Sequence, residues 1–436
     1  MRRLHAVGCH RLRQKTSALA SVVAAAPLSE SSRSAVSPHS DPSSSPPTAP
    51  CTNLTDEELL LQRAVRDFAV KHVAPKVLKM DEDSKMCPEL IQQCFKAGFM
   101  GIETPSQYNG SGMSFFSSIL AIEELARVDS SVAGLVDVQN TLVNTILRTW
   151  GTTALQDELL PRLATAEVGS FCLTESGSGS DAFALKTRAE KRGSDWVING
   201  SKVYITNAGE ASIFLVMATV DASKGYKGIT CFAVDAKKTP GVRIGRKENK
   251  MGIRASSTCE VIFENAVVPE SQVISEVGKG YKIAIEALNE GRIGIGAQML
   301  GVAQGAMDVA LPYLFERKQF GSYIGDFQGM QFQYAQQSME IHAARLLVYN
   351  AARKKLAGQA FVEDAAMAKL FASQVAEKTA SKAIEWMGGC GFMKDVGCEK
   401  FYRDAIIGSV YEGTSNIQLH TLAKFVRDRY ARPQTK

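Results

Sequence analysis

A glutamate near the end of the chain stands in a setting that suits acid–base chemistry. Glu412 lies between a tyrosine and a Gly-Thr-Ser turn in the segment YEGTSNIQ, residues 411–418, and helix-like residues follow. An acid near the start of a helix is favoured by the helix dipole, so a solvated helix-end charge is one interpretation. A general base is the other, because burial in an apolar pocket raises the pKa of a carboxyl group toward the useful range. The local sequence leaves both interpretations open.

A glycine-rich segment offers a second candidate site. In FCLTESGSGSDAFALKTRA, residues 171–189, Gly177, Gly179 and Ala182 have the spacing of the dinucleotide fingerprint G-x-G-x-x-G/A. A Rossmann unit needs a helix after this turn, whereas Thr187 leads into strand-like residues. We therefore interpret the segment as a loop of a β domain, either a plain surface turn or a loop that contacts a flavin.

Signatures of several other enzyme classes are missing from the sequence. Beyond residue 50 the histidines are His72, His342 and His420, and no H-E-x-x-H occurs. Neither G-x-S-x-G nor G-x-x-x-x-G-K-[ST] is present. The sequence therefore gives no support to zinc hydrolysis, a nucleophile elbow or P-loop phosphate transfer, and we expect no metal site.

The elements that must position these residues follow a helix, sheet, helix order. Thr55 and Glu58 have the spacing of a capping box before apolar residues at helical intervals, so a helix begins there. Alternating and β-branched runs such as SIFLVMATV predict strands in the middle, and long amphipathic runs resume after Gly278. The pattern predicts an α+β fold with a helical domain at 53–167, a small antiparallel β domain at 168–277 and a helical bundle at 278–436.

The first 50 residues differ in composition from the rest of the 436-residue chain. They hold six of its basic and two of its acidic residues, so most of the formal net charge of +5 belongs to this leader. We therefore expect no nucleic-acid partner. Spaced arginines, many serines and no acid before Glu30 predict a mitochondrial transit peptide and linker over residues 1–52. The alternative is a secretory signal with SALASVVAAAPL as its apolar core.

Cysteine usage and hydropathy bear on the cellular compartment and on membrane insertion. The nine cysteines show no C-x-x-C and no regular framework, which favours the reducing mitochondrial matrix over an extracellular location. No apolar stretch reaches the roughly 18–20 residues that a membrane-spanning helix needs. We expect no integral membrane segment.

Seven segments, in the same order and spread over all three regions, resemble the acyl-CoA dehydrogenase family. They are FCLTESGSGSD, KVYITNA, GYKGITCFAVD, NEGR, RKQFG, EWMGGCGF and YEGTS. The resemblance covers residues 53–430. It implies a β-barrel-like middle domain, a C-terminal four-helix bundle, and an FAD held noncovalently between them.

The resemblance also implies an activity. Members of the family remove an α-proton and a β-hydride from an acyl-CoA, and this chain is most similar to members that oxidise short and 2-methyl-branched substrates such as 2-methylbutyryl-CoA. Electrons would pass to electron-transfer flavoprotein during isoleucine and fatty acid catabolism, in a homotetramer built as a dimer of dimers. The alternatives are another chain length, a 2-methyl-branched enoyl-CoA reductase, an acyl-CoA oxidase, or a CoA- or flavin-binding assembly factor without activity.

Site residues follow from the resemblance position by position. The cofactor-binding residues would be Phe171, Cys172, Leu173, Thr174, Gly179, Ser180, Tyr204, Ile205, Thr206, Arg317, Gln328, Glu385, Trp386, Met387, Gly388, Gly389, Thr414, Ser415 and Asn416. The substrate-binding residues would be Ser180, Tyr226, Tyr281, Asn289, Glu290, Gly291, Arg292 and Gly413. Arg317, Gln328 and residues 385–389 would reach the FAD of a neighbouring subunit, where an arginine suits a pyrophosphate.

Three positions bear on the chemistry implied by the resemblance. Glu412 would be the catalytic base, since the other position used for the base in some relatives is Gly291 here. Tyr204 stands where relatives often have a tryptophan, which gives a smaller stacking surface. Glu385 stands where relatives often have a glutamine, so its hydrogen bonding there is open, and a plain helix-end charge is the alternative.

Overall fold

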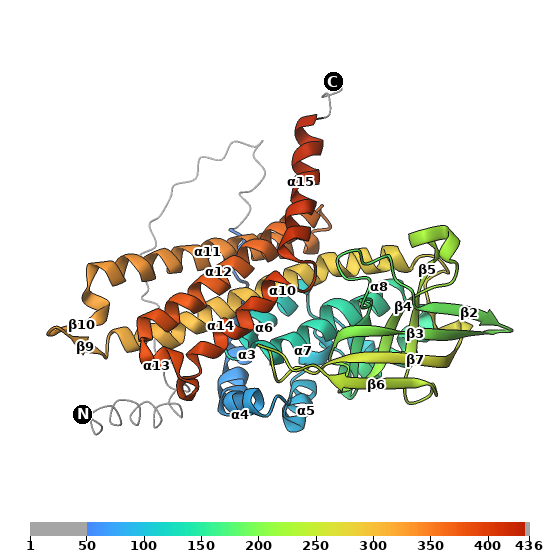
Figure 1. The fold of residues 1–436 in the computed structure, drawn as a ribbon, viewed down its shortest axis with the longest axis horizontal. Coiled ribbons are helices and arrows are strands. Elements are labelled where there is room, and N and C mark those ends of the chain that lie inside the picture. The colour runs from blue at the N-terminus through green and yellow to red at the C-terminus, as the bar shows by residue number, and fades with distance from the viewer. Residues whose placement is uncertain (1–49, 432–436) are drawn as a thin grey trace.

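The protein has helices at both ends of the chain and a β-sheet between them. The computed structural model describes residues 50–431 (Figure 1). This order confirms the predicted α+β layout, whereas the transit peptide and nearly all of the linker predicted for residues 1–52 lie outside the described residues. In the part of the chain that is described, no helix combines the length and the apolar character needed to cross a membrane.

The N-terminal region is helical, as predicted. Its first helix begins at the expected capping box: Thr55 Oγ1 accepts a hydrogen bond from the Glu58 backbone N–H (3.2 Å), and Glu58 Oε2 accepts one from the Thr55 N–H (2.9 Å). After α7 the chain continues as a π-helical stretch, Val138–Asn144, a geometry often found at functional sites. The α-helices of this region are α3 (Asp56–Phe68), α4 (Val77–Glu82), α5 (Pro88–Lys96), α6 (Phe115–Ala126), α7 (Ser130–Asp137), α8 (Thr145–Trp150) and α9 (Thr153–Thr165).

The middle region is one open sheet of mixed direction. Its strands lie in the order β6-β7-β3-β2-β4-β5-β8, with β1 beside β4. The expectation of an antiparallel, barrel-like domain needs correction, because β1 and β2 both pair with β4 in parallel and the sheet does not close. The long loop after β1 returns the chain to the start of β2, so β1, β2 and β4 all run in the same direction. The strands are β1 (Val168–Cys172), β2 (Arg188–Arg192), β3 (Asp195–Thr206), β4 (Ala211–Thr219), β5 (Ile229–Asp235), β6 (Val242–Lys247), β7 (Thr258–Pro269) and β8 (Val273–Ile274).

The C-terminal region is a helical bundle. Three long helices, α10, α11 and α12, pack against one another, and the shorter α14 packs against α10 and α12. The last helix, α15, contacts α12 and projects from the body (Figure 1). The elements are α10 (Gly280–Leu314), the hairpin β9 (Lys318–Gln319) and β10 (Ser322–Tyr323), α11 (Gln328–Leu356), α12 (Val362–Met387), α13 (Gly389–Phe392), α14 (Cys398–Ala405) and α15 (Ser415–Ala431).

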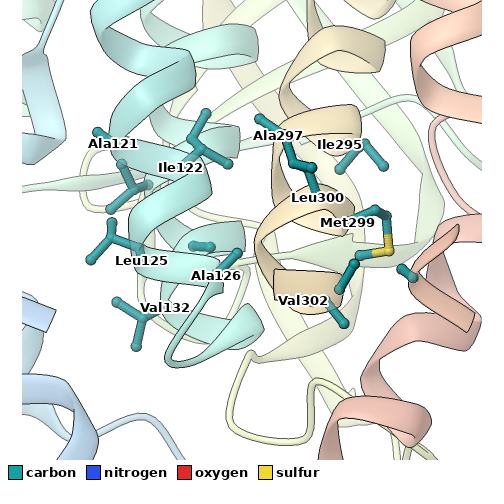
Figure 2. Close-up of a cluster of buried hydrophobic side chains, with 14 of the residues drawn as sticks. Ala121, Ile122, Leu125, Ala126, Val132, Ile295, Ala297, Met299, Leu300 and Val302 are labelled. Carbon is teal, nitrogen blue, oxygen red and sulfur yellow. The ribbon is translucent and has the colours of Figure 1, made fainter. Parts of the chain in front are cut away.

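The largest core lies where α10 packs against α6 and α7. Figure 2 shows Ile122 and Leu125 on one side of this contact and Ala297 and Leu300 on the other, all of them buried. Glycines of α10 allow the helices to approach closely, because a Cβ atom at Gly301 would overlap a backbone carbonyl oxygen of α6. The position of α10 is therefore fixed by backbone contact as well as by side-chain packing.

Buried charges hold the three regions together. Lys400 of α14 pairs with Asp129 (2.9 Å), whose carboxylate also caps α7. Asp404 of α14 accepts a hydrogen bond from the Ile253 N–H (2.6 Å) in the loop between β6 and β7. Because a buried charge without its partner is strongly destabilising, these contacts fix the sheet relative to the helices.

We expect Gly301→Ala to lower the thermal unfolding midpoint, since overpacking of a tight core costs about 1–3 kcal/mol. Gly329→Ala in α11 is the matched control, because no atom lies within 4 Å of the Cβ that it would add. Alanine exceeds glycine in helix propensity by roughly 1 kcal/mol, so the control should unfold at the native temperature or slightly higher. Equal midpoints for both variants, measured by circular dichroism, would contradict the close approach of α10.

Candidate active site

Glu412 lies in a strained turn just before α15. Its backbone has φ +52° and that of Gly413 has φ +84°, so two successive residues occupy the left-handed region that L side chains rarely adopt. Gln418 Nε2 donates to the carbonyl oxygens of Glu412 (3.2 Å) and Gly413 (2.9 Å). Lys369 Nζ, from α12, donates to the same Gly413 oxygen (2.8 Å). Side chains from two helices therefore hold the turn.

The carboxylate of Glu412 points inward rather than into solvent. Its Oε2 atom is buried, and among residues 50–431 no group forms a hydrogen bond with it. A Cβ atom at Gly291 of α10 would lie 3.0 Å from this oxygen and 3.2 Å from Leu142 Cδ2, so the carboxylate packs tightly against α10 at this glycine. A solvated helix-end charge would not place its oxygen against a helix backbone and a leucine.

Burial dominates the electrostatics of this carboxylate. It raises the pKa of Glu412 to about 7, and the positive charges of Arg292 and Lys369 partly oppose that rise. Arg292 donates from Nη1 to Asn289 Oδ1 (2.8 Å), which orients its guanidinium within α10. Glu412 is therefore ready to exchange a proton near neutral pH.

Asp137, the last residue of α7, provides a second buried carboxyl group. It lies against α10 about one helical turn beyond Gly291. Asp137 occupies the space over Gly294, where a Cβ atom would overlap the Asp137 carboxyl group. The Thr141 hydroxyl lies 2.9 Å from Asp137 Oδ1. Burial and the nearby charge of Glu412 raise the pKa of Asp137 well above its usual value, so this carboxyl stays protonated over a wider pH range.

The ring of Tyr411 is fixed on the same side of α10. Its hydroxyl donates to Gln298 Oε1, and Gln298 Nε2 in turn donates to the Ser130 carbonyl oxygen (2.7 Å) and hydroxyl (2.9 Å). Burial raises the pKa of Tyr411 well above its ordinary value, so the phenol remains a neutral donor. The surface that Tyr411 and Gln298 form beside Glu412 is thus held in place and poor in water.

The sheet contributes an exposed aromatic ring and an open loop. Tyr204 of β3 has φ +58° and a side chain that is 66% exposed, in contrast to its buried neighbour Ile205. The Val203 N–H donates to the Thr174 carbonyl oxygen (2.9 Å), so this part of β3 lies beside the segment that follows β1. Gly177 and Gly179 in the next loop have no atom within 4 Å of an added Cβ.

A buried ion pair shapes that loop. Lys202 of β3 donates to Glu175 Oε1 (2.7 Å) and to the Leu173 carbonyl oxygen (3.0 Å), and it is completely buried. Glu175 also accepts hydrogen bonds from the backbone N–H groups of Lys186 (2.6 Å) and Thr187 (2.9 Å). One lysine therefore connects the end of β1 to both ends of the glycine-rich loop.

The residues expected at the site fall into two groups in space. Glu412, Gly413, Gly291 and Arg292 come together, and the rings of Tyr226 and Tyr281 lie 4.7 Å apart. Glu290 turns toward another network, where its Oε2 lies 3.2 Å from Lys355 Nζ. The side chains of Cys172 and Ile205 are buried, so only their backbones are available to a ligand.

The second group lies at the far end of the bundle. It comprises Arg317, Gln328 and residues 385–389, near the β9–β10 hairpin and α13, opposite the sheet in Figure 1. Glu385 lies sixteen positions after Lys369 in α12, which is about 24 Å along a helix axis. The exposed Glu385 pairs with Lys382 (2.6 Å). One chain does not bring this group to Glu412.

Four buried polar residues near the site were missed from sequence. They are Asp137, Lys202, Lys369 and Gln418. A signal was available for Lys369, which is the single charge in the apolar stretch AAMAKLFA, and for Lys202, an inward-facing lysine on a strand. No local pattern distinguishes Asp137 or Gln418 from exposed helical residues.

Three family models together match most of the described chain. Acyl-CoA dehydrogenase, N-terminal domain, matches residues 55–167, the middle domain of the same family matches residues 170–266, and its C-terminal domain matches residues 278–426.

Individual proteins are similar over nearly the same extent. The mitochondrial short/branched chain specific acyl-CoA dehydrogenase of Rattus norvegicus is 56% identical over 382 residues, which is 88% of this chain and 88% of the relative. The probable short/branched chain specific acyl-CoA dehydrogenase of Dictyostelium discoideum is 56% identical over 376 residues, 86% of this chain and 91% of the relative. The solved structure of butyryl-CoA dehydrogenase from Megasphaera elsdenii has a TM-score of 0.84 and 39% identity, covering 86% of this chain and 99% of that chain.

Glu412 should take up its proton near pH 7, because burial raises its pKa to about that value. Infrared difference spectra recorded across a pH titration, with Glu412→Gln as the reference, would isolate the carboxyl band of this residue. A midpoint at the ordinary glutamate value of 4.5 would mean that the carboxylate is solvated.

Proposed function

The chain belongs to the acyl-CoA dehydrogenase family and is an acyl-CoA dehydrogenase, and we propose that its substrates are short and 2-methyl-branched acyl-CoA thioesters. The names of relatives that are 56% identical support this substrate class. The observation that carries the catalytic proposal is the buried Oε2 of Glu412, which lacks a hydrogen-bond partner among residues 50–431. Such an oxygen is placed to accept a proton from a bound molecule.

Glu412 is the proposed catalytic base. The α-proton of a thioester is very weakly acidic, so the base must be positioned at the α-carbon in a site that excludes water. In the proposed reaction the α-carbon–hydrogen bond breaks and its proton passes to Glu412 Oε2. The β-carbon loses a hydride, and a double bond forms between the two carbons. The wall formed by Tyr411, Leu142 and Gly291 excludes water from this step.

The cofactor that we propose is FAD. The residues fit a flavin, because Tyr204 leaves a large aromatic face exposed beside the backbone of residues 171–174, and a flavin ring can stack on such a face. The open glycines of the next loop allow a ligand to approach the backbone. When bound, FAD accepts the hydride that leaves the β-carbon.

The CoA part of the substrate would lie along the sheet side of α10. The edge-to-face pair of Tyr226 and Tyr281 offers an aromatic surface to the CoA tail. Arg292 and Asn289 extend this path toward Glu412, and Ser180 in the glycine-rich loop would contact both ligands. The path would lead from the exposed Tyr226 and the half-buried Tyr281 to the Glu412 carboxylate.

We also propose a homotetramer built as a dimer of dimers. Arg317 and Gln328 lie too far from Glu412 to serve the site of their own chain, which supports a contribution to a neighbouring subunit. Large apolar side chains at the same end, Phe320 (96% exposed) and Phe392 (76% exposed), are suited to a contact between subunits. The mitochondrial relatives support a mitochondrial location, and we propose the matrix, with electron-transfer flavoprotein as electron acceptor.

Glu412→Gln should fold, bind FAD and bind acyl-CoA, yet fail to reduce the flavin. The amide preserves the shape of the side chain but cannot accept the α-proton, so ground-state binding survives while the transition state loses its base. Loss of a general base typically lowers a rate ~10² to 10⁴-fold. Anaerobic stopped-flow measurement of flavin bleaching tests this expectation.

Glu290→Gln is the matched control, because Glu290 is a half-buried acid next to Gly291 in the chain and pairs with Lys355. The loss of one peripheral hydrogen bond is worth about 1 kcal/mol, so its bleaching rate should stay within roughly tenfold of the native rate. Near-native bleaching by Glu412→Gln, or a dead Glu290→Gln, would contradict the assignment of the base.

A panel of acyl-CoA thioesters tests the substrate class. We expect 2-methylbutyryl-CoA and butyryl-CoA to reduce the flavin fastest, since the relatives of highest identity that are described above are short/branched-chain enzymes. Dodecanoyl-CoA should be slower in the same anaerobic titration. A faster reaction with the long-chain thioester would overturn the proposed specificity while leaving the base assignment intact.

A further inference from the structure

Lys369 differs from the other buried lysines of the described chain. Lys202 pairs with Glu175 (2.7 Å) and Lys400 pairs with Asp129 (2.9 Å), so each of these ammonium groups contacts a carboxylate. Lys369 is completely buried too, but within residues 50–431 its ammonium forms no ion pair, and its hydrogen bond goes to a carbonyl oxygen. Burial without a contacting anion is costly, which calls for a reason specific to this place.

The carbonyl oxygen that Lys369 contacts belongs to the residue after the proposed base. Gly413 O accepts hydrogen bonds from Lys369 Nζ (2.8 Å) and Gln418 Nε2 (2.9 Å). Both donors are fully buried, and both act on the turn in which Glu412 and Gly413 have positive φ. One donor is charged and the other neutral, although they hold the same atom.

We propose that Lys369 is a positioning residue with two roles: it fixes the strained turn through Gly413, and it keeps a positive charge beside the Glu412 carboxylate. This inference rests on the proposed function of Glu412 as the base. The charge favours the ionised carboxylate, which is the form that accepts the α-proton. Gln418 has the first role only.

Few of the groups that surround the proposed base carry a charge. Arg292 faces it from α10 and is the second cation. Asp137, at the end of α7, and Tyr411, in the turn itself, both have pKa values that burial raises well above their ordinary values, which favours their neutral forms. Lys369, on α12, has its pKa lowered by burial to about 8, so it is charged where the base operates. Lys369 and Arg292 therefore oppose the effect of burial on Glu412.

The sign of the pH effect follows from this arrangement. Removing the charge of Lys369 takes away a group that stabilises the Glu412 anion, so the pKa of Glu412 should rise above its value of about 7. The acidic limb of the rate of flavin reduction should then move to higher pH, by roughly one unit or more, which is the usual effect of losing a nearby opposite charge on the pKa of a carboxyl group. Loss of a neutral donor to Gly413 should lower the rate without moving the limb.

Lys369→Met and Gln418→Met make a matched pair, because each removes one donor to the same carbonyl oxygen and introduces the same side chain. Anaerobic stopped-flow reduction by saturating butyryl-CoA would be recorded across pH for the holoenzyme. The infrared titration of Glu412 would be repeated on the same variants, as a readout independent of turnover. We expect a higher midpoint in both measurements for Lys369→Met and the native midpoint for Gln418→Met. If Lys369→Met does not fold, Lys369→Gln keeps a donor without the charge and should show the same shift.

Lys369→Arg keeps the charge and should retain the native midpoint even if its rate falls. Native midpoints in both Lys369→Met and Lys369→Gln would overturn the electrostatic role, and so would equal shifts in the Lys369 and Gln418 variants. Failure of the base assignment is distinguishable, since it would appear as native bleaching by Glu412→Gln whatever the Lys369 variants show.

Discussion

The proposed base imposes the main constraint on this site, because a catalytic carboxylate would have to be ionised and also kept from water. Desolvation of the Glu412 carboxylate disfavours its charged form, and without compensation it would favour the protonated form, which cannot act as a base. The structure balances this with two cations, Arg292 and Lys369, that approach the carboxylate without contacting its Oε2. A direct ion pair would occupy the oxygen that is proposed to accept the substrate proton. Because these cations do not contact Oε2, they stabilise the ionised carboxylate and leave this oxygen without a partner among residues 50–431.

The glycines of α10 serve both helix packing and the candidate site, because each of them lacks a Cβ atom. Gly301 lets the backbone of α6 approach, whereas Gly291 and Gly294 leave room for the carboxyl groups of Glu412 and Asp137. The contact with α6 and the placement of the two acids are therefore set along one helix. Because α10 is held by backbone contact in its middle, its site-forming segment has little freedom to shift. This rigidity would suit the proposed base, which would have to stay within reach of a single carbon atom.

Sequence patterns predicted what depends on near neighbours. The capping box at Thr55, the helix, sheet, helix order and the turn at Glu412 all rest on residues a few positions apart, and the structure contains each of them. The parallel pairing of β1 with β4 depends instead on how a long loop returns. The role of Lys369 depends on a contact with Gly413, 44 positions away, which no local pattern encodes. Burial of Asp137 likewise follows only once α7 lies against α10.

The division of the expected site residues between two ends of the molecule bears on assembly. The hairpin of β9 and β10 follows α10, whose 35 residues extend over about 50 Å, whereas Glu412 lies against the part of α10 near the sheet. If both groups serve one cofactor, the hairpin end of one subunit must lie beside the Glu412 end of another. A twofold axis satisfies this requirement reciprocally, since each subunit then completes the site of the other through the same surface. The exposed Phe320 would be buried by that contact, so catalysis and assembly would depend on the same residues at the end of α10.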